Sequence, residues 1–228
     1  MKCNHCSEES LIRKGKLGIK QRYQCKNCGK YQQDIYSYKM YDPQDDKLIK
    51  IYNSEGVGIR SMSRILGYSE STVIRRILYL ASKVTKPIYS EKNQVYEVDE
   101  MWTYVGKNDP SCYSWITYAL NRRTNSIIDV AFGSRNRTNL KQVIDSVKVH
   151  DPKKIVTDKL IIYPNLITPV DHDTNRYSNN HIERGNLTLR THIKRLFRKT
   201  ICFSKSQKML EACVLLYFDF HYWKLKMS

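Results

Sequence analysis

Carboxylates stand inside a segment that the sequence predicts to be a strand. From Gln94 to Trp102 the residues alternate between two faces, so Glu97 and Asp99 share one face, and Tyr96, Val98 and Glu100 lie on the other. A charge within an apolar, β-branched run costs free energy unless it is paired or holds a cation. The position of Asp99 therefore suggests a metal site.

Two acids further along the chain are candidate partners for Asp99. The β-branched run from Lys154 ends in Asp158, and Glu183 lies in the first turns of a helical segment that begins near Asn180. Carboxylate oxygens are ligands that suit Mg²⁺ or Mn²⁺. We predict that Asp99, Asp158 and Glu183 converge on Mg²⁺ (or Mn²⁺).

Three other acids remain alternatives to a member of this set. They are Glu97, Glu100 and Asp129. Glu100 is the least favoured of them, because strand alternation turns it away from Asp99.

Four of the seven cysteines form two close pairs near the N-terminus. Cys3 and Cys6 make one C-x2-C pair, and Cys25 and Cys28 make the second, with 18 residues between the pairs. Two such pairs present four thiolates, the donor set of a structural Zn²⁺ site, whereas a redox pair or two disulfides are the alternatives. With few apolar residues nearby, this module is expected to need its metal to fold.

The net charge of +17 predicts a polyanionic partner. Residues 1–92 carry 18 basic and 9 acidic side chains, residues 93–179 carry 11 and 10, and residues 180–228 carry 10 and 3. The nearly neutral middle holds Asp99 and Asp158, and both flanks are basic. This distribution favours a protein that binds phosphates at its edges and cations at its centre, although a basic solvated surface would have the same charge.

Two short helical segments predict a helix-turn-helix. Ile59 to Leu66 and Glu70 to Leu78 are separated by Gly67, Tyr68 and Ser69, which suit a turn and a helix cap. The second helix would then offer its exposed polar side chains to double-stranded DNA. These are Ser71, Thr72, Arg75 and Arg76. The alternative is a three-helix packing unit whose arginines face water.

The helix around Glu183 has a second polar feature. At 100° per residue, Glu183 shares one face with Asn186, Arg190 and Lys194. Together with Arg195, Arg198 and Lys199, this face predicts a track for DNA phosphates that leads away from the metal site. The alternative is a basic helical face that is only solvated.

The order of predicted elements indicates the fold. Three strands (94–99, 112–121 and 126–133), a helix (139–149), a strand (154–158), a possible short strand (168–171) and a helix from about residue 180 give an α/β, ribonuclease-H-like catalytic domain, in which the first and fourth strands are neighbours. We predict a zinc-ribbon module at 1–40, a helix-turn-helix domain at 41–86 and the catalytic domain with C-terminal helices at 93–228.

No apolar run reaches the roughly 18 residues of a membrane span, and no signal peptide is evident, so we expect a cytoplasmic protein at the prokaryotic nucleoid.

Several of these motifs resemble those of the insertion-sequence-one family of transposases. The resemblance rests on the paired cysteines, the helix-turn-helix, Val98–Trp102, Ile182–Asn186 with Leu189-Arg190, Phe203–Ser206 and the 24 residues between Asp158 and Glu183. It implies a recombinase of the Asp-Asp-Glu class in which Asp99, Asp158 and Glu183 are the catalytic acids and the four cysteines bind zinc. It also implies that the helix around Ser71–Arg76 reads terminal inverted repeats.

Such an enzyme would cut the element ends and join them to target DNA. Since both ends must be processed together, a homo-oligomer is expected, most simply a dimer. Two other functions compete with this one. One is a zinc-ribbon and helix-turn-helix transcriptional regulator with an inactive catalytic domain, and the other is a structure-selective nuclease that cannot join ends.

Overall fold

The computed structural model describes residues 1–35, 41–175, 178–197 and 199–223 and contains two compact units, Met1–Met40 and Tyr41–Ser228. The predicted boundary at residue 40 and the predicted end of the catalytic domain at 228 lie outside the described residues. Among those described, none of the helices has the length and apolar character that a membrane crossing requires.

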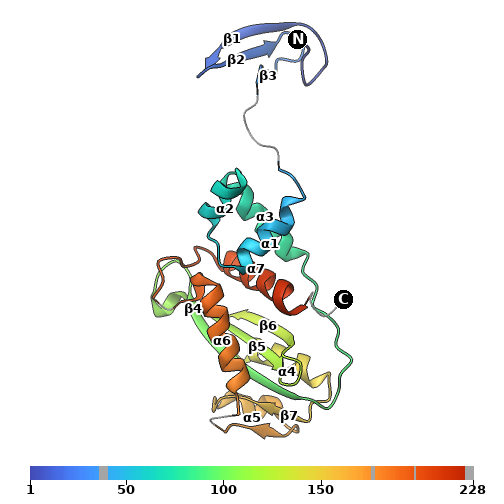
Figure 1. The fold of residues 1–228 in the computed structure, drawn as a ribbon, viewed down its shortest axis with the longest axis vertical. Helices are drawn as coiled ribbons and strands as arrows, with labels where there is room; N and C mark the ends of the chain where they lie inside the picture. Colours follow the sequence, from blue (N-terminus) through green and yellow to red (C-terminus); the bar gives the residue numbers. More distant parts are fainter. Residues whose placement is uncertain (36–40, 176–177, 198, 224–228) are drawn as a thin grey trace. The chain divides into compact units, whose positions relative to one another are not determined.

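The N-terminal unit contains a small antiparallel sheet. Its strands are β1 (Leu11–Leu17), β2 (Lys20–Cys25) and β3 (Tyr31–Gln33), in that order (Figure 1). The strand β2 ends at Cys25, and Gly29 follows the second cysteine pair with a φ of 71°, a value that favours glycine. The strands thus bring two pairs of cysteines that are distant in sequence to the same end of a compact module.

The second unit begins with three helices, α1 (Asp45–Ser54), α2 (Ile59–Leu66) and α3 (Glu70–Ser82). Gly67 ends α2 with a φ of 71°, and the Ser69 hydroxyl caps α3 by accepting a hydrogen bond from the backbone N–H of Thr72 at 3.2 Å. The predicted turn between the two helices is therefore present.

A five-stranded mixed sheet follows these helices, with the order β6-β5-β4-β7-β8 (Figure 1). The strands are β4 (Val95–Tyr104), β5 (Tyr113–Asn121), β6 (Ile127–Gly133), β7 (Lys154–Val156) and β8 (His172–Asp173). The central strand β4 is antiparallel to β5 and parallel to β7. This confirms the mixed α/β class and the predicted pairing of the first strand with the fourth.

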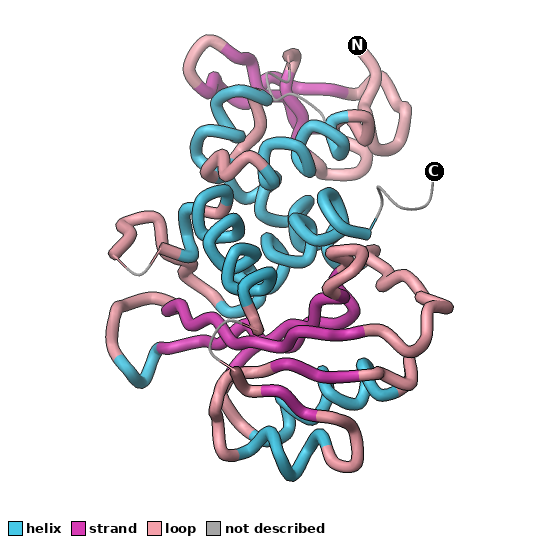
Figure 2. Tube along the Cα trace, turned by 60° about the horizontal axis from the view of Figure 1, so that its bottom comes forward, coloured by secondary structure: helices cyan, strands magenta, loops and turns pink. Residues whose placement is uncertain are grey.

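Helices cover both faces of the sheet (Figure 2). The face of Tyr96 and Val98 packs against α4 (Arg137–Lys148) and α5 (Ile162–Ile167). The opposite face packs against α6 (Asn180–His192) and α7 (Gln207–Phe218). Short 3₁₀ turns at Pro110–Cys112 and Lys194–Leu196 and a π-helical turn at Asp219–Trp223 complete the described elements.

The helix α7 belongs to two hydrophobic cores. Leu210 and Val214 pack toward the sheet and α6, whereas Cys213 and Leu216 pack among α1, α2 and α3. A helix with two apolar faces can be buried on both of them. The helix α7 therefore joins the core of the three N-terminal helices to the core between the sheet and α6.

Several boundaries differ from the sequence expectation, and three of them bear on the site. The strand β4 continues to Tyr104, beyond the predicted end at Asp99, because its whole length pairs with β5. The strand β7 ends at Val156, so Asp158 lies in the loop after it. The last strand is His172–Asp173 instead of 168–171.

Candidate active site and cysteine cluster

Three carboxylates meet at the edge of the sheet beyond the end of β7. One oxygen each from Asp99, Glu100 and Asp158 lies within 4.8 Å of the other two. The parallel pairing of β4 with β7 covers only Val95 to Glu97, so the next residues of β4 have no strand beside them on that edge. Asp158 lies in this opening. Asp99 and Asp158 therefore converge, as predicted.

Glu100 is the unexpected member of this cluster, and the expectation that it turns away from Asp99 is wrong. The Glu100 side chain does leave β4 on the face opposite to that of Asp99. Because this edge of β4 is unpaired, the Glu100 carboxylate still reaches the same opening. The Glu100 side chain is fully buried and contacts Arg135, with Nη2 to Oε2 at 3.4 Å. Burial raises the pKa of Glu100, and the Arg135 guanidinium opposes that rise.

Asp99 is held by a short chain of hydrogen bonds. The Asn186 amide donates to Asp99 Oδ2 at 2.7 Å, and the Tyr118 hydroxyl donates to Asn186 Oδ1 at 3.0 Å. Burial raises the pKa of Asp99 to about 7, and the nearby carboxylates of Glu100 and Asp158 add to the rise. A divalent cation would relieve this repulsion, and the oxygen donors are those that Mg²⁺ or Mn²⁺ prefers, so the site fits such an ion.

Glu183 lies close to this cluster but outside it. It is exposed in the first turn of α6 and lines one hollow together with Asp158, Lys159 and Asn179. Two of the three predicted acids, Asp158 and Glu183, therefore line one surface depression. Asp99 converges with Asp158 in the carboxylate cluster and does not line that depression.

The two remaining alternative acids have structural partners. Glu97 accepts hydrogen bonds from Arg122 Nε at 2.7 Å and from the backbone N–H of Ile182 at 2.9 Å, and thereby ties β4 to the start of α6. Asp129 is paired with Lys86 and accepts a hydrogen bond from Ser146 at 2.7 Å. Neither belongs to the carboxylate cluster that the described residues form.

The helix α6 ends earlier than the predicted cationic face requires. It stops at His192, and the backbone of Ile193 leaves the helical conformation, so Lys194 and Arg195 belong to a separate 3₁₀ turn. Lys194 is exposed, and Arg195 donates to Ser204 at 3.1 Å.

The two predicted DNA-contacting residues within α6 are less accessible. Asn186, predicted to contact DNA, is buried against Asp99 instead, and Arg190 is half-buried. Among the described cations of the predicted track, Lys194 and Lys199 are thus fully open to solvent, and Arg198 lies outside the described residues.

The helix α3 presents a mixed surface. Ser71 and Arg75 are exposed, and Thr72 is half-buried. Arg76 is half-buried in an ion pair with Asp46 and lies over the ring of Tyr41 at 4.5 Å, so much of its hydrogen-bonding capacity is already used.

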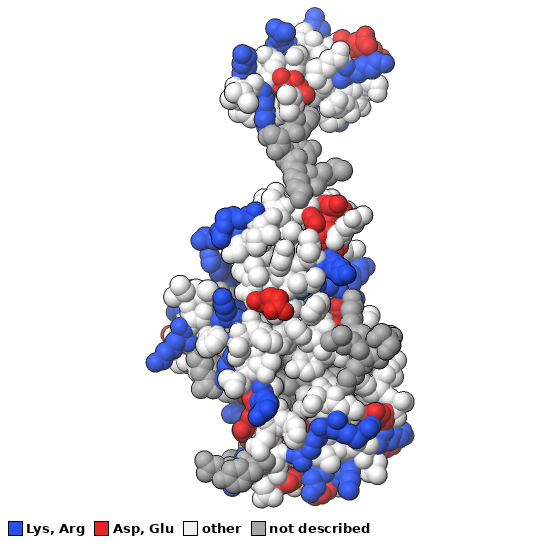
Figure 3. All heavy atoms as spheres, viewed as in Figure 1, with Lys and Arg blue, Asp and Glu red and all other residues white. Residues whose placement is uncertain are grey.

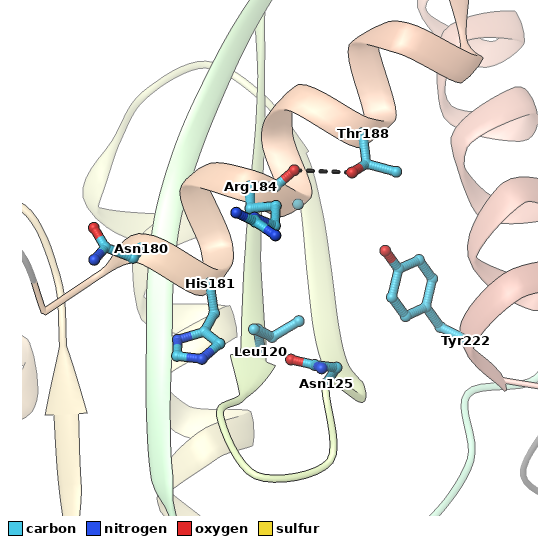
Figure 4. A pocket seen from close by; sticks show the side chains of 8 residues that line it. Leu120, Asn125, Asn180, His181, Arg184, Thr188 and Tyr222 are labelled. Carbon is cyan, nitrogen blue, oxygen red and sulfur yellow. Dashed lines mark hydrogen bonds between the residues drawn. The ribbon is translucent and has the colours of Figure 1, made fainter.

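A second hollow lies beside α6, and Figure 4 shows it from close by. Asn180, His181, Arg184 and Thr188 reach it from the helix, and Tyr222 bounds it from the opposite side.

Lys and Arg side chains occur in several separate groups on the face drawn in Figure 3. In that view the positive charge does not form one continuous stripe over the residues it colours.

The four predicted cysteines converge in the N-terminal unit. Their sulfurs lie within 4.8 Å of one another, with Cys3 Sγ and Cys28 Sγ at 3.6 Å and Cys6 Sγ and Cys25 Sγ at 3.6 Å. Chiefly through the backbone N–H of Cys28, the pKa of Cys25 is lowered to about 6. The backbone N–H of His5 likewise lowers the pKa of Cys3. Four sulfurs, two of them with a lowered pKa, fit a tetrahedral Zn²⁺ site, and they do not form disulfides.

Comparison with known proteins decides the family. A model of the IS1 transposase family matches residues 94–224, more than half of the chain, and this range contains all the clustered acids. The chain belongs to the IS1 transposase family. The InsB protein of insertion element iso-IS1n from Shigella dysenteriae is 32% identical over 127 residues, which is 56% of this chain and 95% of the relative. The InsB protein of insertion element IS1 4 from Escherichia coli strain K12 is also 32% identical over 127 residues, 55% of this chain and 75% of the relative.

These matches confirm the predicted family and make the chain a DNA transposase. Two solved structures are more distant. A simian T-cell lymphotropic virus intasome in complex with a PP2A regulatory subunit matches at a TM-score of 0.40 and 14% identity, over 76% of this chain and 68% of that chain. The HTLV-2 integrase catalytic core domain in complex with magnesium matches at a TM-score of 0.40 and 9% identity, over 57% of this chain and 85% of that chain.

Besides Glu100, two features of the acidic site in this IS1-family transposase were not predicted. Asn186 holds Asp99, and its place three residues after Glu183 on one helix face was the available signal. Arg135 contacts both Glu100 and Asp158 from the loop before α4. No signal in the sequence distinguished it, because arginine in a polar loop is ordinary.

Proposed function

We propose that this transposase belongs to the Asp-Asp-Glu class, with a ribonuclease-H-like catalytic fold, and uses Asp99, Asp158 and Glu183 to hold Mg²⁺ or Mn²⁺. The observation that supports this most strongly is the meeting of Asp99 and Asp158, 59 positions apart in sequence, at the open edge of neighbouring parallel strands. Glu183 lines the same surface depression as Asp158, which also supports the proposal.

The proposed reaction has two steps at phosphorus. In the first, a water oxygen attacks the phosphate at the transposon end, and the 3′ oxygen leaves with a proton as a free hydroxyl. In the second, that hydroxyl attacks a phosphate of target DNA, and the 3′ oxygen of the target leaves. Bound divalent cations would lower the pKa of the attacking oxygen and balance charge on the leaving oxygen.

The chain's own residues orient this chemistry. The Asn186 amide fixes the Oδ2 oxygen of Asp99, and the Tyr118 hydroxyl fixes the Asn186 amide in turn. Burial raises the pKa of Tyr118 well above its ordinary value, so its hydroxyl stays protonated and keeps donating. Such support around a carboxylate preserves its position when cation and DNA arrive.

The other parts of the chain would bind the substrate. The exposed Ser71 and Arg75 of α3 are the proposed readers of terminal inverted repeats, with Thr72 and Arg76 beside them. Lys194, Arg190 and Arg195 would contact phosphates of the terminal repeats or target DNA. Zn²⁺ on the four cysteines would stabilise the N-terminal unit, and a homodimer is the simplest assembly that processes two element ends together.

The decisive experiment incubates purified protein with labelled terminal-repeat DNA and Mg²⁺ or Mn²⁺. Asp158→Asn and Glu183→Gln are expected to reduce nicking and strand joining by at least about a hundredfold, because each removes a charged oxygen ligand. DNA binding, measured by gel shift in the absence of metal, should persist in both variants.

Asp145→Asn is the matched control. Asp145 is an exposed acid that pairs with Lys141 on α4, away from the carboxylate cluster, so this variant should keep full activity. Unchanged strand joining in Asp158→Asn would contradict the proposed acids. Tight DNA binding without cleavage by any form of the protein would favour a regulator with an inactive catalytic domain, and cleavage without joining would favour a nuclease.

A further inference from the structure

Arg135 bridges two of the clustered carboxylates. Its Nη2 atom lies 3.2 Å from Asp158 Oδ2 and 3.4 Å from Glu100 Oε2. The side chain is about a third exposed, with a relative accessibility of 31%, and it reaches the cluster from the loop between β6 and α4. A cation of the protein itself thus already occupies one side of the acidic site.

The surroundings hold Arg135 in this position. Its guanidinium carbon lies 4.7 Å from the centre of the Trp115 ring, a distance at which a cation is attracted to the aromatic face. The Asn139 amide donates to the carbonyls of Phe132 at 3.2 Å and Ser134 at 2.8 Å, and so fixes the loop on the N-terminal side of Arg135. The side chain is therefore placed by packing and does not reach the acids by chance.

The two oxygens of Asp158 have different partners. Oδ1 accepts the backbone N–H of Leu160 at 2.9 Å, which leaves Oδ2 as the oxygen available to a cation. This is the oxygen that Arg135 contacts. A divalent cation that binds Asp158 through Oδ2 must compete with the guanidinium for it.

Glu100 has a different relation to Arg135. It is buried and meets the guanidinium with both carboxylate oxygens, Oε1 to Nε at 3.5 Å and Oε2 to Nη2 at 3.4 Å. A buried carboxylate needs a positive partner, and Arg135 is the one that the described residues provide. Glu100 thus acts as the anchor of Arg135, which leaves Asp99 and Asp158 for the metal.

We propose that Arg135, anchored by Glu100, is an internal competitor for divalent metal at Asp158 and sets the metal affinity of the site. Without metal, the guanidinium bridge holds the acids together. When metal binds, Arg135 gives up Asp158 Oδ2 and remains on Glu100. This inference rests on the proposed metal site, and it assigns Arg135 and Glu100 as positioning residues.

The test measures Mn²⁺ affinity without DNA, by following the electron paramagnetic resonance signal of free Mn²⁺. Arg135→Gln is expected to bind Mn²⁺ about fivefold more tightly than the unmodified protein. The substitution removes a competing ion pair, and a partly exposed ion pair of this kind changes a dissociation constant by about tenfold or less. Arg135→Lys keeps the charge but loses the planar fork, so its affinity should lie between the two. Unchanged or weaker binding in Arg135→Gln would overturn the proposal.

Glu100→Gln separates an anchor from a metal ligand. Alone, it should weaken Mn²⁺ binding, because the freed guanidinium then competes fully for Asp158. In the Arg135→Gln background it should change the affinity by less than about twofold, since its effect passes through Arg135. An equal loss in both backgrounds would mean that Glu100 binds the metal directly and that the anchoring role is wrong.

Two controls distinguish this inference from the proposed function. Arg123→Gln removes an arginine that pairs with the partly exposed Glu91 and should leave Mn²⁺ binding unchanged. Asp158→Asn should abolish tight Mn²⁺ binding. If it does not, the metal site itself is misassigned. If it does and Arg135→Gln still fails to tighten binding, only the role of Arg135 is refuted.

Discussion

Gly185 shows how closely the residues around the proposed catalytic acids are fitted. It lies within α6, where glycine costs about 1 kcal/mol relative to alanine. A Cβ atom at this position would be 2.8 Å from the Tyr118 hydroxyl, which donates to Asn186 Oδ1 and to the Ile182 carbonyl. The glycine gives up helix stability so that the tyrosine can approach and orient the partner of Asp99.

Gly185→Ala should therefore destabilise the protein, although alanine is the better helix former. We expect the free energy of unfolding to fall by about 1–3 kcal/mol, the usual cost of overpacking, when measured by urea denaturation. In a Tyr118→Phe background the obstructing oxygen is absent, so the same substitution should be neutral or stabilising. A stabilising effect of Gly185→Ala with Tyr118 intact would show that the close approach does not constrain the helix.

At the scale of elements, the ends of α6 and α7 meet through a group of rings. The His192 Nδ1 atom and the Tyr217 hydroxyl are 2.7 Å apart, and the His221 ring is 4.4 Å from the Tyr217 ring and 5.8 Å from the His192 ring. Burial lowers the pKa of His221, and the neighbouring His192 lowers it further, while Glu55 opposes the shift. The junction therefore favours a neutral His221.

This junction should make stability depend on pH. A histidine whose pKa is lowered by folding takes up its proton more readily in the unfolded chain, so stability is retained above about pH 6.5 and lost as the pH falls toward the folded pKa. We expect the melting temperature of the unmodified protein to drop more steeply from about pH 7.5 to about pH 5.5 than that of His221→Gln. Parallel curves for the two proteins would exclude this histidine as a source of the dependence.

The limits of sequence reasoning are also clearest among the elements. Alternation within β4 correctly assigned Tyr96 and Val98 to one face, since the packing of a strand follows its period of two. It failed for Glu100, because the outcome depended on where the neighbouring strand β7 stops. Likewise, the helical spacing of the polar face suggested one helix through Lys194, but α6 ends at His192, and no proline or glycine marks that end.

Arg135 was missed for a related reason. Its role depends on three-dimensional neighbours, Trp115, Glu100 and Asp158, that lie on different elements, and the spacing of residues along the chain does not reveal such a meeting. The close spacing of the cysteine pairs, in contrast, reflects the local geometry of a turn. It identified the members of that cluster directly.

At the scale of the whole molecule, α1, α2 and α3 do not have a closed core of their own. Ile49, Met62 and Val73 pack with Met209 and Leu216 of α7, more than a hundred residues later in the chain. The sequence-based division at residues 86 and 93 therefore separates segments that share an interior. The division into a helix-turn-helix domain and a catalytic domain stays a prediction about function, and it does not follow the packing of the hydrophobic cores.

A fragment of residues 41–86 should consequently fail to fold by itself. Without α7 its apolar core face is left open to water, and burial of that face is the main source of its stability. We expect poorly dispersed amide signals in nuclear magnetic resonance spectra and no cooperative thermal transition. A well-folded fragment that binds terminal-repeat DNA would instead support truncated forms that act as repressors.

The shared position of α7 also bears on where the DNA is cut. If α3 reads the element end, the number of base pairs between the recognised sequence and the broken phosphodiester bond is set by a rigid interior and not by the covalent connection from Lys83 to Lys92. The transposase would then cut at a fixed number of base pairs from the recognised sequence. Substitutions that open small cavities beside α7 would make the position of the cut less uniform before they abolished cutting.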